Sequence, residues 1–246
     1  MALERDAEDW IGKAQARLAA ADLAPRLEHV GRVEVIGDGV ATVSGLPHAR
    51  LDELLGFADG TLGMAMTIGE ERLGCVLLSA GEGISAGGTV TRTGKIARVP
   101  VGEGLLGRVI SPIGAPLDGG PAVTAERFDP VERRAPGIVD RALVSEPLLT
   151  GLTVIDAMIP LGRGQRQLVI GDRKTGKTTL AIDTIIHQRD SDVICVYAAI
   201  GQKASTVARV IDSVKRHGAP ERCVFVVGAA DAAPGAQWIA PYAACT

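Results

Sequence analysis

The chain has 246 residues, of which 46% are hydrophobic and 22% charged, and its formal net charge is −3 at pH 7. This length allows one large domain or two smaller ones, and the composition is ordinary for a globular protein. The weakly acidic balance argues against a nucleic-acid-binding surface, which is usually basic, and no uninterrupted apolar run approaches the roughly 20 residues that a membrane span needs.

Residues 1–27 contain a predicted amphipathic helix over 3–21. Its apolar residues fall on one stripe at helical spacing: Leu3, Ala7, Trp10, Ile11, Ala14, Leu18 and Ala21. Such a helix can pack on its own domain or dock on a partner protein. It precedes a β-rich segment and has little of its own to cover, so both interpretations stay open.

Residues 28–95 are predicted to form a small β-barrel or a sandwich. Short runs of Val, Ile, Leu and Thr alternate here with glycine turns, of which Gly37-Asp38-Gly39 is the clearest. Barrels that bind oligonucleotides use aromatic platforms and basic residues, whereas Phe57 is the only aromatic residue of this segment. The segment therefore favours a structural or assembly role.

Residues 96–246 are predicted to be an α/β domain that begins with a connector rich in Gly and Pro over 96–150. From residue 151 the pattern alternates between helix and near-continuous apolar strand. The predicted elements are a helix over 153–159, a strand over 167–171, a helix over 177–189, a strand over 192–198, a helix over 203–217 and a strand over 222–228. Such alternation is typical of a parallel sheet covered by helices on both faces.

The four cysteines are Cys75, Cys195, Cys223 and Cys245. They are far apart in the sequence and form no CxxC pair, and Cys195 and Cys223 lie in apolar, strand-like runs. We therefore expect all four to be reduced and buried rather than bound to a metal or paired in a disulfide.

Residues 171–178, Gly-Asp-Arg-Lys-Thr-Gly-Lys-Thr, match the phosphate-loop pattern G-x-x-x-x-G-K-[ST] at every fixed position. The flanks also fit, with a predicted strand before the loop and a helix after it. Glycines let the backbone curl so that successive N–H groups face one anion, and the helix adds its positive end. We predict that Lys177 reaches the β- and γ-phosphates and that the Thr178 hydroxyl ligates Mg²⁺.

Hydrolysis needs more than this loop, namely a carboxylate in the metal shell and a group that polarises the attacking water. The strand over 192–198 ends without an acid, and Asp231 follows the next strand only after a short loop. The water-polarising position, expected just after the strand over 192–198 and beside the phosphate loop, holds Gln202. An amide has no useful basicity at pH 7, so Gln202 cannot act as a general base, although it could orient a water.

Longer motifs resemble the α subunit of F-type ATP synthases. The matching segments are TGLTVIDAMIPLGRGQRQLVIGDRKTGKTTLAIDTI, VGEGLLGRVISPIGAPLDG, RAPGIVDR, SEPLLTG and IGQKASTVARV. GDRxTGKT and IGQK distinguish this subunit from the catalytic β subunit, whose loop resembles GGAGVGKT and whose water-polarising residue is glutamate. The resemblance implies a small N-terminal β-barrel followed by a RecA-like P-loop α/β domain.

The same resemblance implies a non-catalytic subunit of an ion-translocating ATP synthase that binds Mg-ATP, or ADP, without turning it over. It implies no catalytic residue, and Thr178 as the metal ligand. The implied nucleotide-binding residues are Gly171, Asp172, Arg173, Lys174, Thr175, Gly176, Lys177, Thr178, Thr179 and Gln202. Implied partners are β subunits in an alternating hetero-hexamer, the γ subunit and, through the N-terminal helix, the peripheral stalk. The chain would then lie peripherally on the cytoplasmic face of the bacterial inner membrane.

Three features depart from the family pattern. Lys174 stands where the family usually has Gln, and Ala204 where it usually has Arg. We interpret Lys174 as solvent-facing, although a second cation could tighten nucleotide binding. Family members are also considerably longer, so we expect this chain to be a fragment that lacks the metal-carboxylate strand. The alternatives that stay open are an assembly module with an idle phosphate loop and a related flagellar or secretion ATPase.

Overall fold

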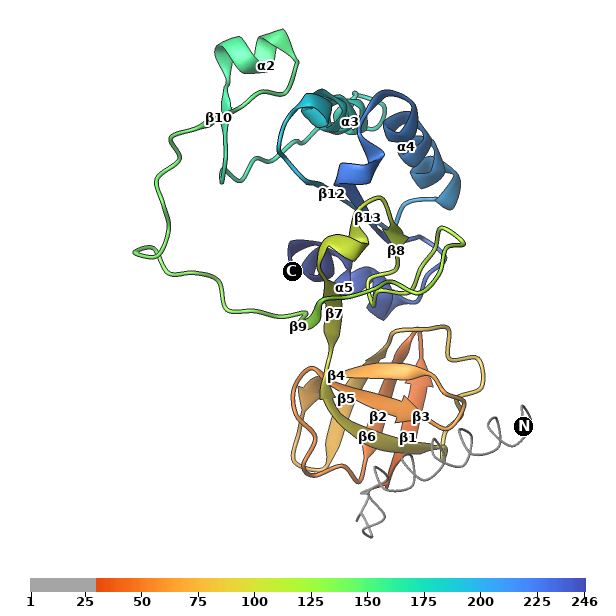
Figure 1. The fold of residues 1–246 in the computed structure, drawn as a ribbon. Helices are drawn as coiled ribbons and strands as arrows, with labels where there is room; N and C mark the ends of the chain where they lie inside the picture. The colour runs from red at the N-terminus through yellow and green to blue at the C-terminus, as the bar shows by residue number, and fades with distance from the viewer. Residues whose placement is uncertain (1–29) are drawn as a thin grey trace, which may run out of the picture.

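The computed structural model describes residues 30–246, so the helix predicted over 3–21 lies outside the described residues. The described chain has two parts, a β-barrel and an α/β part that lies above it in Figure 1. Strand β7 (Arg98–Val101) leads from the first part to the second. The predicted order, a barrel followed by an α/β part, is confirmed.

Six antiparallel strands close into the barrel in the order β1-β2-β5-β4-β3-β6. Their bounds are β1 Val30–Gly37, β2 Val40–Ser44, β3 Glu53–Phe57, β4 Leu62–Ile68, β5 Arg72–Leu77 and β6 Thr89–Ile96. Asp38 and Gly39 join β1 to β2 with φ angles of 51° and 75°. Two consecutive residues at positive φ are what the common two-residue hairpin turn requires, so the predicted turn is confirmed.

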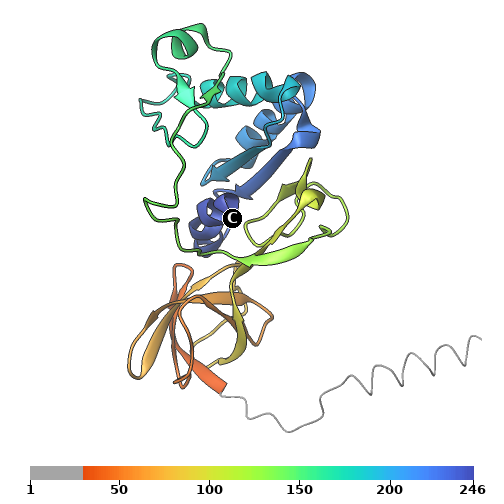
Figure 2. The same cartoon turned by 60° about the vertical axis from the view of Figure 1, so that its left-hand side comes forward.

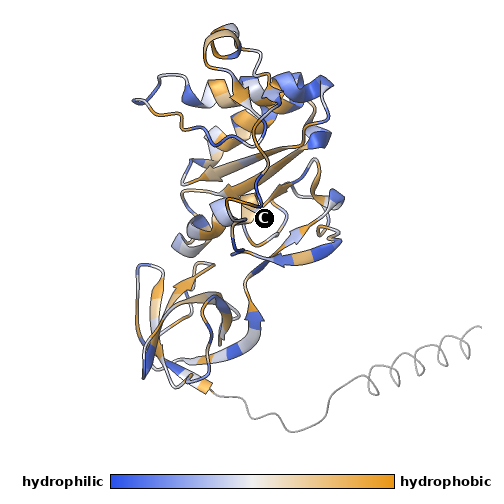
Figure 3. Ribbon diagram, turned by 90° about the vertical axis from the view of Figure 1, so that its left-hand side faces the viewer, coloured by the Kyte–Doolittle hydropathy of each residue, from blue (hydrophilic) through white to orange (hydrophobic). Residues whose placement is uncertain are grey.

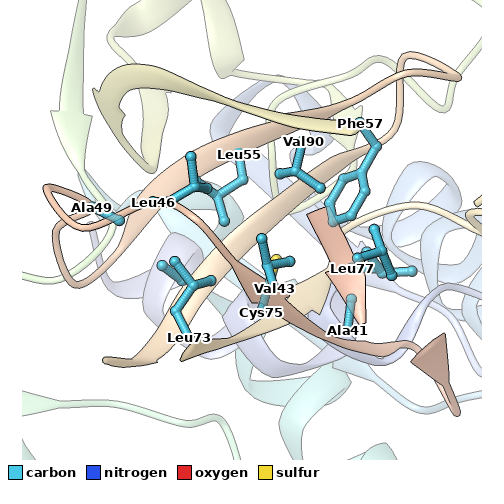
Figure 4. Packing of buried hydrophobic residues seen from close by; sticks show 12 residues of the cluster. Ala41, Val43, Leu46, Ala49, Leu55, Phe57, Leu73, Cys75, Leu77 and Val90 are labelled. Atoms are coloured by element: carbon cyan, nitrogen blue, oxygen red, sulfur yellow. The ribbon is translucent and has the colours of Figure 1, made fainter. Parts of the chain in front are cut away.

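The barrel interior is filled mainly by aliphatic side chains, as Figure 4 shows. Successive side chains of a strand project to opposite faces, and in β2 Ala41 and Val43 are accordingly buried while their neighbours are not. The buried cluster consists of Val33, Ala41, Val43, Leu46, Ala49, Leu55, Phe57, Ala65, Leu73, Cys75, Leu77 and Val90. Phe57 therefore packs inside the barrel, where it cannot serve as a stacking platform for a base.

The segment over 96–150 is more than a connector. β7 pairs with β9 (Arg127–Pro130), and β8 (Val109–Ile110) adds a strand to the α/β sheet. A short 3-10 turn, η1 (Glu103–Leu105), lies between β7 and β8. A strand of two residues has no readable hydrophobic alternation, which is why the sequence pattern did not predict this addition to the sheet.

The α/β part is built on a parallel sheet of three strands in the order β12-β13-β8. Its other elements and their bounds are β10 Pro147–Leu148, α2 Thr153–Met158, β11 Leu161–Gly162, α3 Lys177–His187, η2 Gln188–Asp190, β12 Cys195–Ile200, α4 Ala204–His217, η3 Pro220–Arg222, β13 Cys223–Gly228 and α5 Pro234–Cys245. Four predicted elements, over 153–159, 177–189, 203–217 and 222–228, are therefore present with ends shifted by at most two residues, and the strand over 192–198 begins later.

Helices cover both faces of this sheet, as predicted. On one face Phe225 and Val227 of β13 pack with Val207 and Val214 of α4, and α3 adds Ile182 and Ile185 to the same cluster. On the other face, residues of α5 pack beside β13 and β12 (Figures 1 and 2). Every residue of β13 is consequently buried, and Figure 3 shows the hydrophobic residues concentrated along these strands.

The strand predicted over 167–171 is not formed. Leu168, Val169 and Ile170 are 77%, 44% and 85% exposed, and their backbone lies outside every sheet of the described residues. An apolar run becomes a strand only when a neighbouring strand pairs with its N–H and C=O groups. β12 pairs with β13 alone among residues 30–246, so no strand of the described sheet leads into the phosphate loop.

Helix α5 lies between the sheet and the barrel, as Figure 2 shows. Pro234 at its start packs over Gly39 of the β1–β2 turn, and Gly235 lies directly against the Leu77 carbonyl at the end of β5. A Cβ on Gly235 would come within 2.3 Å of that oxygen. The contact between the two parts therefore depends on the absence of a side chain at this position.

We expect Gly235→Ala to lower the free energy of unfolding by about 1–3 kcal/mol, because the nearest obstacle is a backbone atom that cannot rotate away. The higher helix propensity of alanine, about 1 kcal/mol, offsets only part of this cost. Gly37→Ala is the matched control, since nothing lies within 4 Å of its added Cβ. Chemical denaturation of both variants measures the difference, and equal stabilities would contradict the close packing of α5 on the barrel.

Candidate functional site

The candidate site is the loop over 171–178, which leads into α3. Gly176 caps the helix with φ of 91° and ψ of 6°, a left-handed conformation that glycine adopts without steric cost. Glycine also offers no side chain to the first N–H groups of α3, and these groups lack partners within their own helix. A free helix start of this kind attracts an anion through its N–H groups and its positive dipole end.

Side chains of the loop hold its backbone in a curled conformation. The Thr175 hydroxyl donates a hydrogen bond to the Asp172 carbonyl at 2.8 Å. The Lys177 ammonium donates to the carbonyl oxygens of Gly171 and Asp172 and lies 3.4 Å from the Thr175 Oγ1. Lys177 thus folds over the loop rather than away from it, which keeps its positive charge at the start of α3.

The remaining loop residues are open to solvent. Asp172, Arg173 and Lys174 are exposed, as are Thr178 and Thr179 in the first turn of α3. Lys174 has φ of 65°, a left-handed conformation that is uncommon for a residue other than glycine or asparagine. Its exposure agrees with the interpretation of Lys174 as solvent-facing.

The described residues offer a metal ion few protein ligands at this site. Residues 30–246 contain no cluster of three or more His, Cys, Asp or Glu side chains that could hold a metal ion. Mg²⁺ is often bound through one or two protein ligands, substrate phosphates and several waters. The exposed Thr178 hydroxyl, next to Lys177, can supply one such ligand.

Gln202 lies just beyond the carboxyl end of β12. Its side-chain amide and the Tyr197 hydroxyl are 3.4 Å apart, and its backbone carbonyl accepts a hydrogen bond from the Ala230 N–H at 3.0 Å. These contacts fix Gln202 between β12 and the loop after β13, and no recorded hydrogen bond in the described chain joins it to residues 171–178. The phosphate loop predicted from the sequence is thus formed, while the hydrogen-bond partners of Gln202 are Tyr197 and Ala230.

Asp231 lines a cavity to which residues 171–178 do not contribute. The cavity has a volume of about 560 Å³, and its other walls are mostly apolar residues, among them Ile113, Val207 and Ile211. Ala204 lines the same cavity. Tyr197, which holds Gln202, went unnoticed in the sequence because a tyrosine within an apolar strand also fits the hydrophobic core, and here its ring indeed lies beside Phe225.

Comparison with known proteins gives one consistent result. The model of the ATP synthase alpha/beta family, nucleotide-binding domain, matches residues 151–246, and that of the same family's beta-barrel domain matches residues 27–94.

No helix in residues 30–246 combines the length and the apolar character that crossing a membrane requires.

Individual relatives are similar over nearly the whole chain. ATP synthase subunit alpha 3 of Paraburkholderia xenovorans (strain LB400) is 55% identical over 96% of this chain, and ATP synthase subunit alpha 2 of Burkholderia thailandensis is 57% identical over 95%. A third, ATP synthase subunit alpha 2 of Burkholderia pseudomallei (strain 1710b), is 55% identical over 95%. These matches cover 45%, 42% and 35% of the relatives, so the chain spans less than half their length.

Proposed function

The chain belongs to the ATP synthase alpha/beta family, and we propose that it has the role of the α subunit, which binds Mg-ATP or ADP without hydrolysing it. The observation that supports nucleotide binding is the curled loop over 171–178 at the start of α3, where no side chain caps the helix and Lys177 folds over the loop. In this assignment the phosphates lie on the N–H groups from Gly171 to Thr179. Lys177 neutralises the β- and γ-phosphates, and Thr178 contributes a ligand to Mg²⁺.

The proposed absence of turnover is supported by the chemistry and placement of the two residues considered for hydrolysis. Gln202 carries an amide rather than a carboxylate, so it cannot accept a proton from water at pH 7. Asp231 lines an apolar cavity instead of the loop. Mg²⁺ would screen the phosphate charge, and this chain's residues would only bind and orient the nucleotide.

The partners follow from the same assignment. We assign the chain to an ion-translocating ATP synthase, where it alternates with β subunits in a hetero-hexamer around a γ subunit, with residues 1–27 docking on the peripheral stalk. The barrel over 28–95 then has an assembly role, which agrees with the burial of Phe57, and the nucleotide-binding domain runs over 96–246. The chain would lie peripherally on the cytoplasmic face of the bacterial inner membrane.

Calorimetric titration with Mg-ATP, combined with a phosphate-release assay on the same sample, tests this proposal. The expected result is saturable binding with no steady release of phosphate. Steady Mg-dependent hydrolysis that Lys177→Ala abolishes would contradict the non-catalytic role. A chain that folds but binds neither Mg-ATP nor Mg-ADP would instead favour the alternative, an assembly module with an idle phosphate loop.

A further inference from the structure

Two cysteines begin neighbouring strands of the sheet. β12 starts with Cys195 and β13 with Cys223, and the parallel register places these residues directly opposite each other. Residues opposite each other in adjacent strands project to the same face of the sheet. Both side chains accordingly belong to the cluster on the face covered by α3 and α4, so the two thiols are side by side although 27 residues separate them in the sequence.

The two thiols have different environments. Cys223 is 4% exposed, and its Sγ lies 3.3 Å from the Ala219 carbonyl, to which it can donate a hydrogen bond. Cys195 is half-buried and is therefore the more accessible residue of the two. The expectation that all four cysteines are buried is wrong for Cys195, and also for Cys245, which is exposed.

Their mutual contact also separates their acidities. A hydrogen bond between the two side chains lowers the pKa of Cys195, and the nearby Arg222 guanidinium lowers it further, while burial opposes both effects. The same hydrogen bond, together with burial, raises the pKa of Cys223. A more accessible thiol of lowered pKa beside a second thiol is the usual arrangement of a redox-sensitive pair.

We propose that Cys195 and Cys223 form a reversible dithiol–disulfide site that hydroperoxides oxidise. The Cys195 thiol first loses its proton to solvent, and the thiolate attacks one oxygen of the peroxide. An S–O bond forms, the O–O bond breaks, and the other oxygen leaves as hydroxide or alkoxide, which takes a proton from solvent to become water or alcohol. The Cys223 sulfur then attacks the Cys195 sulfenic acid, whose hydroxyl leaves as water with the Cys223 proton. Each thiol loses one electron and one proton, and the peroxide gains both electrons.

The disulfide would join the starts of β12 and β13 covalently. Strand neighbours lie within the range of Cα separations that a disulfide spans, so the sheet need not open. The chain between the two cysteines, which includes α4 and Gln202, would become a closed loop with less freedom in partly unfolded states. Oxidation would therefore stiffen the segment that carries Gln202.

The other two cysteines serve as internal controls. Cys75 is fully buried in the barrel, and burial raises the pKa of its thiol to about 12. Cys245 is exposed but has no cysteine opposite it. Peroxide should leave Cys75 unmodified, and it should take Cys245 to oxygenated acids or to disulfides between chains.

Peptide mapping by mass spectrometry without reduction, after brief treatment of the full chain with hydrogen peroxide, tests the proposal. A Cys245→Ser background removes disulfides between chains that form through this exposed cysteine. The expected product is a cross-linked pair of peptides that contain Cys195 and Cys223 and that dithiothreitol separates again. In Cys223→Ser the link should be absent, and Cys195 should instead accumulate sulfenic and sulfinic acid.

The peptide map of the protein with Cys195 and Cys223 intact tests the proposal even if the Cys223→Ser variant folds poorly. Sulfinic acid on Cys195 with both peptides unlinked would overturn the proposal, because it would show that Cys223 does not resolve the sulfenic acid. An unmodified Cys195 under conditions that oxidise Cys245 in the parent chain would overturn it as well, because the thiol would then be neither accessible nor activated.

Discussion

Replacing Lys177 by alanine is expected to weaken Mg-ATP binding roughly 100-fold, provided that the loop binds nucleotide as we propose. The Lys177 ammonium already lies over the loop, in contact with the carbonyls of Gly171 and Asp172. Hydrogen bonds to charged groups contribute about 1.5–3 kcal/mol each, and 1.4 kcal/mol is tenfold in affinity. Losing the contacts to two phosphates therefore costs about 3 kcal/mol, which calorimetric titration measures directly.

Lys174→Ala is the matched control for this experiment. Lys174 carries the same charge three residues earlier in the loop, but it is exposed, so its removal should change the affinity by less than about threefold through screened electrostatics alone. Lys174→Gly tests in addition whether the φ of 65° is strained, and it should stabilise the loop slightly. A loss for Lys174→Ala as large as for Lys177→Ala would show that both cations bind phosphate.

The elements that the sequence predicted well are those whose pattern is local. α4 carries apolar residues at helical spacing, and Val207, Val210 and Val214 are indeed its buried face. The barrel strands alternate and are separated by glycine turns, so their existence could be predicted, although the pairing of β2 with β5 rather than β3 could not. Strand order depends on long-range contacts, which alternation within one strand does not encode.

The errors have physical causes as well. Residues 167–171 have the composition of a buried strand but lie outside every sheet of the described chain, and composition cannot supply a hydrogen-bonding neighbour. α5 was not predicted; it begins at Pro234 and contains Pro241, and proline is unfavourable in the interior of a helix. A proline at the first helical position removes no hydrogen bond, since that N–H has no partner anyway. The phosphate loop could be predicted because the contacts that shape it are local. Its glycines and Lys177 lie within eight consecutive residues.

Replacing Glu53 by alanine should strongly destabilise the barrel, with a loss of about 3–5 kcal/mol in the free energy of unfolding. Glu53 is 1% exposed. Its carboxylate accepts hydrogen bonds from Arg92 Nε and Nη2 at 3.0 Å and from the backbone N–H groups of Arg50 and Gly94 at 2.9 and 3.0 Å. Removing the carboxylate leaves a largely buried guanidinium and two amides without their partner. Chemical denaturation measures the loss.

The exposed pair Arg72–Glu34 provides the control. Its ions are 2.8 Å apart, but the side chains are 66% and 30% exposed, so Arg72→Ala should cost no more than about 1 kcal/mol. Both pairs belong to the same barrel, but Glu53 is buried and has several hydrogen bonds, whereas the Arg72–Glu34 pair is exposed. Equal losses would mean that burial does not decide the contribution of Glu53.

The pH dependence of stability gives an independent test of the same contact. Burial by itself raises the pKa of Glu53, but the hydrogen bonds from Arg92, Arg50 and Gly94 together outweigh it, so the pKa lies below its ordinary value. A carboxyl whose pKa is lower in the folded state stabilises the fold above its unfolded pKa, and this contribution is lost as the pH falls through the folded pKa. Glu53→Gln should therefore be less stable than the parent at neutral pH and approach it below about pH 4. A stability difference that stays constant down to pH 3 would show that Glu53 acts through its shape rather than its charge.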